Sequence, residues 1–123
     1  MNLVDSSGWL EYLAEGRNAK FFAPAVEDTE NLVVSTINVY EVFKRVLQQR
    51  GEDAALQAAA LMQQAGIVDV TSPIAMDAAK LSAELRLPMA DSLILATARA
   101  CGATLWTQDA DLGGLRGVRF TKK

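Results

Sequence analysis

The fold class is indicated most clearly by residues 87–112, LPMADSLILATARACGATLWTQDADL. Residues 89–101 form a very apolar run of helical length, and Gly102 follows as a residue that commonly ends helices. Residues 104–107, TLWT, then predict a short buried strand, which Asp109 follows closely. A buried helix that leads directly into an apolar strand is typical of an α/β protein.

Short apolar runs alternate with helical segments through the rest of the sequence. Strands are predicted at residues 2–4, 32–34, 67–70, 104–107 and 118–121. Helices are predicted from Ser6 or Ser7 to Gly16, from Ser35 or Thr36 to Gly51, over 53–65, from Pro73 to Pro88 and over 89–101. Between the first two strands, residues 17–30 are mixed, with Pro24 as a breaker and room for a short helix. We therefore predict one domain over residues 1–123, a three-layer α/β/α sandwich with a central parallel sheet.

The composition limits the available chemistry. Half of the 123 residues are hydrophobic, which is enough to form a core. The net charge of −3 does not show the basic excess of many nucleic-acid-binding proteins, although acids gathered at one cation site would leave the remaining surface near neutral. The chain contains no histidine, which excludes Ser-His and Cys-His catalysis and nearly all zinc enzymes. Carboxylates with a hard cation such as Mg²⁺ or Mn²⁺ are the chemistry that remains.

The sequence also predicts where the protein works. The start, MNLVDSSGW, has no basic region, and Asp5 interrupts its apolar stretch, so it does not resemble a signal peptide. No apolar run approaches the roughly 18 residues that cross a bilayer. The single cysteine, Cys101, cannot form an intramolecular disulfide. We expect a soluble, cytoplasmic protein that does not associate with membranes.

Four acids occupy positions from which they can meet at one edge of the sheet. Asp5 directly follows the first strand, and Asp109 follows the strand at 104–107. Because the carboxyl ends of parallel strands share one edge, these two acids must lie on the same side. Glu41, in the second turn of a helix, and Asp91, in the first turn of another, can reach that edge. Four converging carboxylates repel one another unless divalent cations compensate, so the pattern predicts a metal site.

Each acid also has an ordinary structural explanation, and sequence geometry alone leaves both possibilities open. Asp5 can cap the following helix, and Glu41 can pair with Arg45 four residues later. Asp91 can complement a helix N-terminus, but its apolar neighbours make a buried, unpartnered carboxylate expensive. Asp109 can be a turn residue.

The sequence resembles the PIN-domain family and, within it, the VapC-type toxins of bacterial toxin–antitoxin pairs. Three segments carry the resemblance, in the right order and over essentially the whole chain: LVDSSGWLEYL (3–13), VVSTINVYEVFKRV (33–46) and residues 87–112. The last segment is the most specific of the three. The resemblance implies the same α/β/α sandwich around a parallel sheet.

The resemblance also implies a set of site residues. It identifies an acidic quartet that is complete in this sequence: Asp5, Glu41, Asp91 and Asp109. Ser7 and Thr107 match neighbouring hydroxyl positions that are expected to support the site through hydrogen bonds or water. Asp5, Asp91 and Asp109 are expected to hold one or two Mg²⁺ or Mn²⁺ ions. Asp109 is favoured over Asp111 because it lies nearer the strand.

The implied activity is metal-dependent endonucleolytic cleavage of RNA by metal-activated water. A cognate antitoxin protein is expected to block the groove, and a homodimer is expected. The candidate contacts to the RNA backbone are basic residues: Arg45, Arg50, Arg86, Arg99, Arg116, Arg119, Lys122 and Lys123.

Two other functions remain open from the sequence. One is a Mg²⁺-dependent phosphohydrolase with an Asp nucleophile after the first strand, although haloacid-dehalogenase-like enzymes carry DxDx[TV] where this chain has DSSGW. The other is a non-enzymatic protein-binding module whose acids serve only structure or partners.

Overall fold

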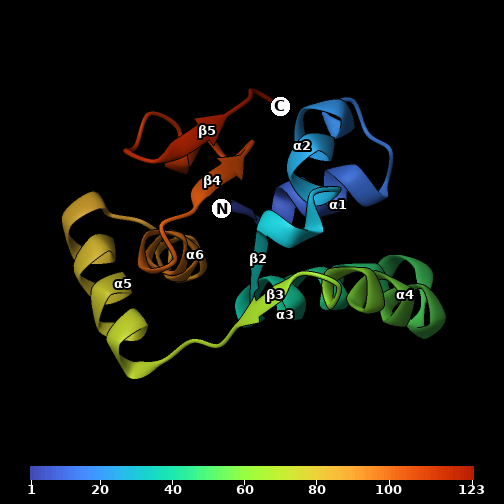
Figure 1. The fold of residues 1–123 in the computed structure, drawn as a ribbon, viewed down its shortest axis with the longest axis horizontal. Coiled ribbons are helices and arrows are strands. Elements are labelled where there is room, and N and C mark those ends of the chain that lie inside the picture. Colours follow the sequence, from blue (N-terminus) through green and yellow to red (C-terminus); the bar gives the residue numbers. More distant parts are fainter.

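Five parallel strands form the central sheet in the computed structural model, which describes residues 1–123 (Figure 1). The strands are β1 (Asn2–Val4), β2 (Leu32–Ser35), β3 (Gly66–Val68), β4 (Thr104–Thr107) and β5 (Val118–Phe120). They lie in the order β3-β2-β1-β4-β5, and every neighbouring pair is parallel. The first strand is therefore in the middle, where Leu3 lies beside Val33 of β2 and Leu105 of β4. The predicted parallel sheet is confirmed.

Six α-helices cover the two faces of this sheet. They are α1 (Ser6–Leu13), α2 (Ala19–Val26), α3 (Thr36–Arg50), α4 (Glu52–Met62), α5 (Ser72–Leu85) and α6 (Met89–Ala100). Two 3-10 turns, η1 (Thr29–Asn31) and η2 (Ala110–Leu112), complete the connections. Figure 1 shows α1–α4 on one side of the sheet and α5 and α6 on the other. The predicted three-layer α/β/α sandwich is confirmed.

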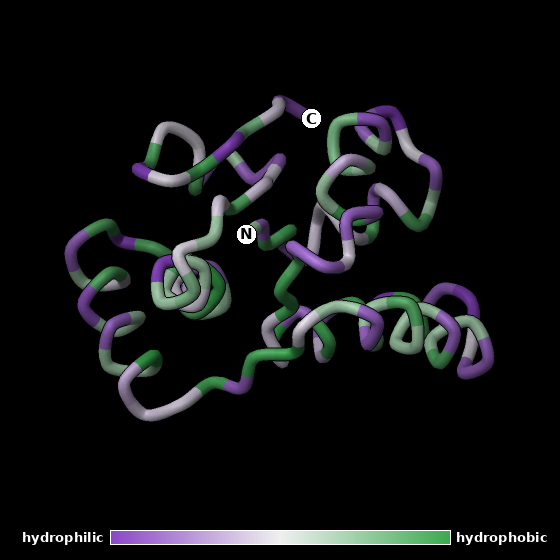
Figure 2. Tube along the Cα trace, viewed as in Figure 1, coloured by the Kyte–Doolittle hydropathy of each residue, from purple (hydrophilic) through white to green (hydrophobic).

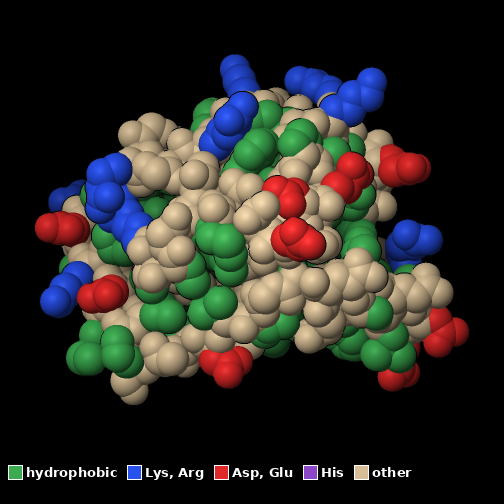
Figure 3. Space-filling view, viewed as in Figure 1, with side chains coloured by type: hydrophobic (Ala, Val, Ile, Leu, Met, Phe, Trp, Pro, Cys, Tyr) green, Lys and Arg blue, Asp and Glu red, His purple; other side chains and the backbone are tan.

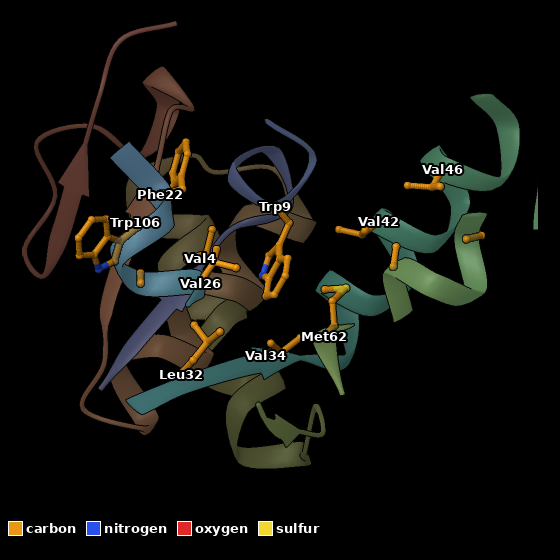
Figure 4. Packing of buried hydrophobic residues seen from close by; sticks show 13 residues of the cluster. Val4, Trp9, Phe22, Val26, Leu32, Val34, Val42, Val46, Met62 and Trp106 are labelled. Carbon is orange, nitrogen blue, oxygen red and sulfur yellow. The ribbon is translucent and has the colours of Figure 1, made fainter. Parts of the chain in front are cut away.

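Side chains alternate along the strands and so build a core on each face. On β1, Val4 packs with α1–α4, whereas Leu3 packs with α6. On β4, Trp106 and Leu105 divide between the same two faces. Figure 4 shows Trp9 of α1 among the apolar side chains of the first face. Figure 2 shows the complementary pattern in the helices, whose hydrophobic residues recur between hydrophilic ones.

The cap at the beginning of α1, which the sequence left open between Asp5 and the two serines, matters for the site. The N-cap residue is Asp5, not Ser6 or Ser7. Asp5 has extended backbone angles, and its Oδ1 accepts a hydrogen bond of 2.8 Å from the Gly8 N–H. A carboxylate is a good cap because it accepts from an N–H that has no partner within the helix. One acid therefore ends a strand and begins a helix.

Pro24 was predicted to break a helix, but it does not do so. It lies inside α2, exposed to solvent, and the helix continues to Val26. Proline removes one backbone hydrogen bond, but Phe22, Ala25 and Val26 are all buried against the core. This apolar packing holds the last turn of the helix despite the lost hydrogen bond. None of the helices in the structure is both long and apolar enough to cross a membrane.

Candidate active site

The four predicted acids line one cleft, which has a volume of about 420 Å³. Asp5 comes from the end of β1, Glu41 from α3, Asp91 from the first turn of α6 and Asp109 from the segment after β4. The cleft therefore lies at the carboxyl edge of the sheet, where parallel α/β folds place their ligands. Residues separated by more than one hundred positions in the sequence meet there.

Asp5 is the most buried of these acids, with only 4% of its surface exposed. In addition to the Gly8 N–H, its carboxylate accepts hydrogen bonds from the Ser7 hydroxyl at 2.9 Å and from the Thr107 hydroxyl at 2.5 Å. Burial raises the pKa of Asp5, these hydrogen bonds oppose the rise, and Asp109 adds to it by charge repulsion. The partners that hold this carboxylate are hydroxyls and a backbone amide, and they leave it without a compensating positive charge.

Thr107 connects two of the acids through one hydroxyl group. It is the last residue of β4 and is fully buried. Its Oγ1 donates to Asp5 Oδ2 and accepts from the N–H of Asp109 at 2.9 Å. The structure thus brings both predicted hydroxyl residues, Ser7 and Thr107, into contact with Asp5.

Asp91 is an acid of the cleft whose ionisation is opposed both by burial and by neighbouring carboxylates. Its pKa is raised to about 7, first by burial and then by the charge of Asp109 and a hydrogen bond with it, with smaller contributions from Asp5 and Asp111. All of these charged neighbours are carboxylates. Burial and the nearby negative charges both disfavour ionisation of Asp91.

Asp111 belongs to the acidic group although Asp109 is the member that lines the cleft. Carboxylate oxygens of Asp91, Asp109 and Asp111 all lie within 4.8 Å of one another. Asp109 caps η2 by accepting the Asp111 N–H at 2.9 Å, while the Asp111 side chain is exposed. Because Asp109 and Asp111 are only two positions apart, the sequence alone could not show which of them lines the cleft.

Two residues that sequence analysis did not predict support Glu41. Ser6 donates its hydroxyl to Glu41 Oε1 at 2.6 Å, and the fully buried Asn38 donates its amide to Ser6 Oγ at 3.1 Å. Asn38 also accepts the Ser35 N–H at 3.0 Å and completes a capping box at the start of α3. A polar residue three positions after Ser35 was the available signal. Glu41 therefore has Ser6 as its hydrogen-bond partner, whereas a pairing with Arg45 was the ordinary explanation from the sequence.

The donor set fits a divalent cation. It consists of carboxylate and hydroxyl oxygens, which suit Mg²⁺ and Mn²⁺, and it contains no imidazole or thiolate. The neighbouring carboxylates that raise the pKa of Asp91 repel its negative charge, and a bound cation would offset this repulsion. The residues that line the cleft are thus compatible with a bound metal ion, and the carboxylates close enough to one another to share one are those of Asp91, Asp109 and Asp111.

Two cations also line the same cleft. Arg45, predicted as a phosphate contact, lines it together with Lys44, which was not predicted. Arg99 and Arg116 instead line a separate cleft near the start of β4, where Arg99 Nη2 donates to the Arg116 carbonyl at 3.2 Å. Arg119 lies over the ring of Trp106, 4.6 Å from its centre. On the face shown in Figure 3, acidic and basic side chains are interspersed, so the net charge of −3 is not a uniformly acidic surface.

Comparison with known proteins shows which family this chain belongs to. The sequence profile of the PIN domain matches residues 3–117, so the chain belongs to the PIN-domain family. The family resemblance inferred from the sequence is confirmed. No match to a curated protein was found at the sequence level.

Solved structures with the same fold include toxins of toxin–antitoxin pairs. The chain is similar to a toxin–antitoxin complex from Klebsiella pneumoniae, with 24% identity, a TM-score of 0.82, and coverage of 97% of this chain and 96% of that one. It is also similar to VapC20 of Mycobacterium tuberculosis, a Sarcin-Ricin loop cleaving toxin, with 21% identity, a TM-score of 0.76, and coverage of 97% and 99%. A DNA-bound VapBC from Salmonella typhimurium has 14% identity, a TM-score of 0.75, and coverage of 99% and 98%. At these identities the likeness establishes the fold.

Proposed function

We propose that this protein is a metal-dependent endoribonuclease and the toxin of a VapBC-type toxin–antitoxin pair. The observation that carries the proposal is the convergence of Asp5, Glu41, Asp91 and Asp109 on one cleft in a PIN-domain chain without histidine. Hydrolysis of a phosphodiester needs an activated nucleophile and stabilisation of negative charge. Without histidine, carboxylates that hold a cation are the groups in this chain that fit both needs.

In this proposal, the residues of the cleft have two roles, binding of the metal ions and positioning of the acids that bind them. Asp5, Asp91 and Asp109 bind one or two Mg²⁺ or Mn²⁺ ions, and Glu41 completes the shell directly or through water. Such an ion lowers the pKa of water and stabilises charge on phosphate oxygens. Thr107 fixes Asp5 relative to Asp109, and Ser6 orients Glu41. Because water attacks instead of the ribose hydroxyl, the expected products carry 5′-phosphate and 3′-hydroxyl ends.

The proposed partners follow from the same likeness. A cognate antitoxin protein is the inhibitor that occupies the groove, and the toxin itself forms a homodimer. The similar structures include toxin–antitoxin complexes, which supports an antitoxin partner. Size-exclusion chromatography with light scattering measures the oligomeric state, and a monomer would contradict the dimer.

The decisive experiment is RNA cleavage with and without a chelator. The wild-type protein is expected to cleave RNA with Mn²⁺ or Mg²⁺ and to lose this activity in EDTA. Asp91→Asn and Asp5→Asn should abolish cleavage while the fold is retained, since Asn keeps the shape of Asp and is itself a good helix cap. Asp77→Asn, an exposed acid of α5 outside the cleft, is the matched control and should remain active.

The products and a second substrate distinguish the competing mechanisms. Ends with 2′,3′-cyclic phosphate would rule out attack by water, and undiminished cleavage by both Asn variants would assign the activity to a contaminant. Hydrolysis of a small phosphomonoester without RNA cleavage would instead support the phosphohydrolase alternative. Absence of both Mn²⁺ binding and cleavage would support a binding module.

A further inference from the structure

The cleft continues past the acids along one face of α3. Tyr40, Lys44 and Gln48 all line it and are spaced four residues apart, so they follow one another on the same helical face. Glu41 and Arg45 form the adjacent row and also line the cleft. The acids and this strip of α3 therefore belong to one continuous cleft, in which Glu41 is the junction.

Tyr40 is unusual among these residues because it is a large aromatic side chain that packs little. It is 62% exposed, whereas both tryptophans are buried. Its ring therefore presents an aromatic face to whatever enters the cleft. A flat π surface beside a cleft is suited to stacking with another planar group.

Two basic residues of α3, Lys44 and Arg45, line the cleft together with Tyr40. Lys44 Nζ lies 5.7 Å from the centre of the Tyr40 ring, within the range of a cation–π contact. Arg45 is the next residue on the helix, and both cations are exposed. In a chain of net charge −3, these two cations of α3 line the same cleft as the acids Asp5, Asp91 and Asp109.

We propose that Tyr40, Lys44 and Arg45 form a platform that binds single-stranded RNA next to the acidic cluster. A base stacks on Tyr40, and Lys44 and Arg45 contact the backbone phosphates on either side of that base. Exposed aromatic rings interleaved with cations are how proteins bind unpaired strands, because every base has a π face and every nucleotide carries a phosphate. The bases of a duplex are stacked on one another and do not offer such a face.

This inference rests on the proposed function, because it describes how that site would hold its substrate. The acids would take the phosphate that reacts, and the platform would hold a neighbouring nucleotide in place. Tyr40 is therefore a positioning residue. It touches the substrate away from the reacting atoms, so its loss should raise KM more than it lowers kcat.

Binding without cleavage tests the platform directly. In EDTA, fluorescence anisotropy measures the Kd of the wild-type protein for a short labelled single-stranded RNA and for the same sequence in a duplex. Tyr40→Ala is expected to weaken binding of the single strand about tenfold, because base–aromatic stacking contributes on that order. Tyr40→Phe and Tyr40→Trp keep the ring and should bind like the wild type, and the duplex should bind more weakly and be unaffected by Tyr40→Ala.

A second variant and two controls separate stacking from general effects. Lys44→Ala should weaken binding and reduce the slope of log Kd against log salt by about one, as expected for one lost phosphate contact. Leu56→Ala and Lys80→Ala remove an exposed apolar and an exposed basic side chain outside the cleft and should leave the Kd unchanged. Circular dichroism of each variant checks that the fold is retained.

Failure of the platform and failure of the proposed function give different results. If the wild-type protein cleaves RNA but Tyr40→Ala binds and cleaves like the wild type, the platform is wrong and the nuclease stands. If the single strand binds through Tyr40 but no metal supports cleavage, the nuclease is wrong and the platform stands. Equal losses in Tyr40→Ala and Tyr40→Phe would assign the effect to the hydroxyl and overturn stacking.

Discussion

Thr107 shows how much of the site depends on one buried hydroxyl. Thr107→Val keeps the shape of the side chain but removes one of the three donors to Asp5, leaving the Ser7 hydroxyl and the Gly8 N–H, and it leaves the Asp109 N–H without its hydroxyl acceptor. We expect Mn²⁺ affinity to fall about 10- to 100-fold, since groups that orient metal ligands have effects of this size. Isothermal titration calorimetry measures this change. Thr107→Ser keeps the hydroxyl and serves as the control, and wild-type affinity in Thr107→Val would contradict the role given to the hydroxyl.

At the residue scale, the sequence predicted charged groups better than the neutral groups that hold them. Asp5 and Asp91 could be found because one follows a strand and the other interrupts an apolar helix. Ser6 and Asn38 could not, because small polar residues occur at many helix starts and their partners depend on side-chain direction. Strand ends and helical periods fix positions along the chain. They do not determine which hydroxyl turns towards which acid.

Among the elements, α1 packs closely against β1 and α2 at Gly8. A Cβ added at Gly8 would lie 2.6 Å from Phe22 Cε1 and 2.7 Å from Val4 Cγ1, both buried side chains. We expect Gly8→Ala to lower the free energy of unfolding by about 1–3 kcal/mol, the usual effect of an overfilled core. Urea denaturation measures this loss.

The control for this substitution is another glycine with ordinary space around it. At Gly66, on β3, the nearest atom to an added Cβ is the Leu32 carbonyl oxygen at 3.7 Å. Gly66→Ala should therefore be close to neutral. Wild-type stability in Gly8→Ala would mean that α1 can shift away from α2, and Asp5, the cap of α1, would then shift with it.

The sequence predicted whether a segment is a helix or a strand better than it predicted the residues at which the helix or strand begins and ends. Residues 104–107 were predicted as a strand and form β4 with the same bounds. The helix predicted over 53–65 is α4, which begins at Glu52 and ends at Met62, because Gly66 already belongs to β3. The prediction that Pro24 breaks a helix was wrong for a different reason. Local propensity marks it as a breaker, whereas burial of its neighbours decides the outcome.

At the scale of the whole molecule, the acidic cluster makes stability depend on pH. An acid whose pKa is higher in the folded state binds its proton more tightly there than in the unfolded chain. For Asp91 the pKa rises from 3.8 to about 7. The metal-free protein should therefore lose free energy of unfolding as pH increases across this interval, since ionisation of Asp91 in the fold becomes increasingly opposed. The buried Asp5 contributes with the same sign.

Urea denaturation in EDTA, repeated between about pH 4 and about pH 8, measures this dependence. Asp91→Asn removes the titrating group, so its free energy of unfolding should fall less over the same range than that of the wild type. Asp77→Asn should follow the wild-type curve. A wild-type curve that rises with pH, or a variant curve that matches it, would contradict the assigned repulsion.

The central position of β1 has a consequence for the order in which the protein is made. Its neighbour β4 is synthesised only after β1, β2 and β3, and the Asp5 N–H bonds to the Trp106 carbonyl of that strand. A nascent chain that stops before β4 has neither Thr107 to hold Asp5 nor Asp109 to join it. The acidic cluster can therefore be complete only after the ribosome has synthesised β4 and the segment that carries Asp109, about one hundred residues after Asp5.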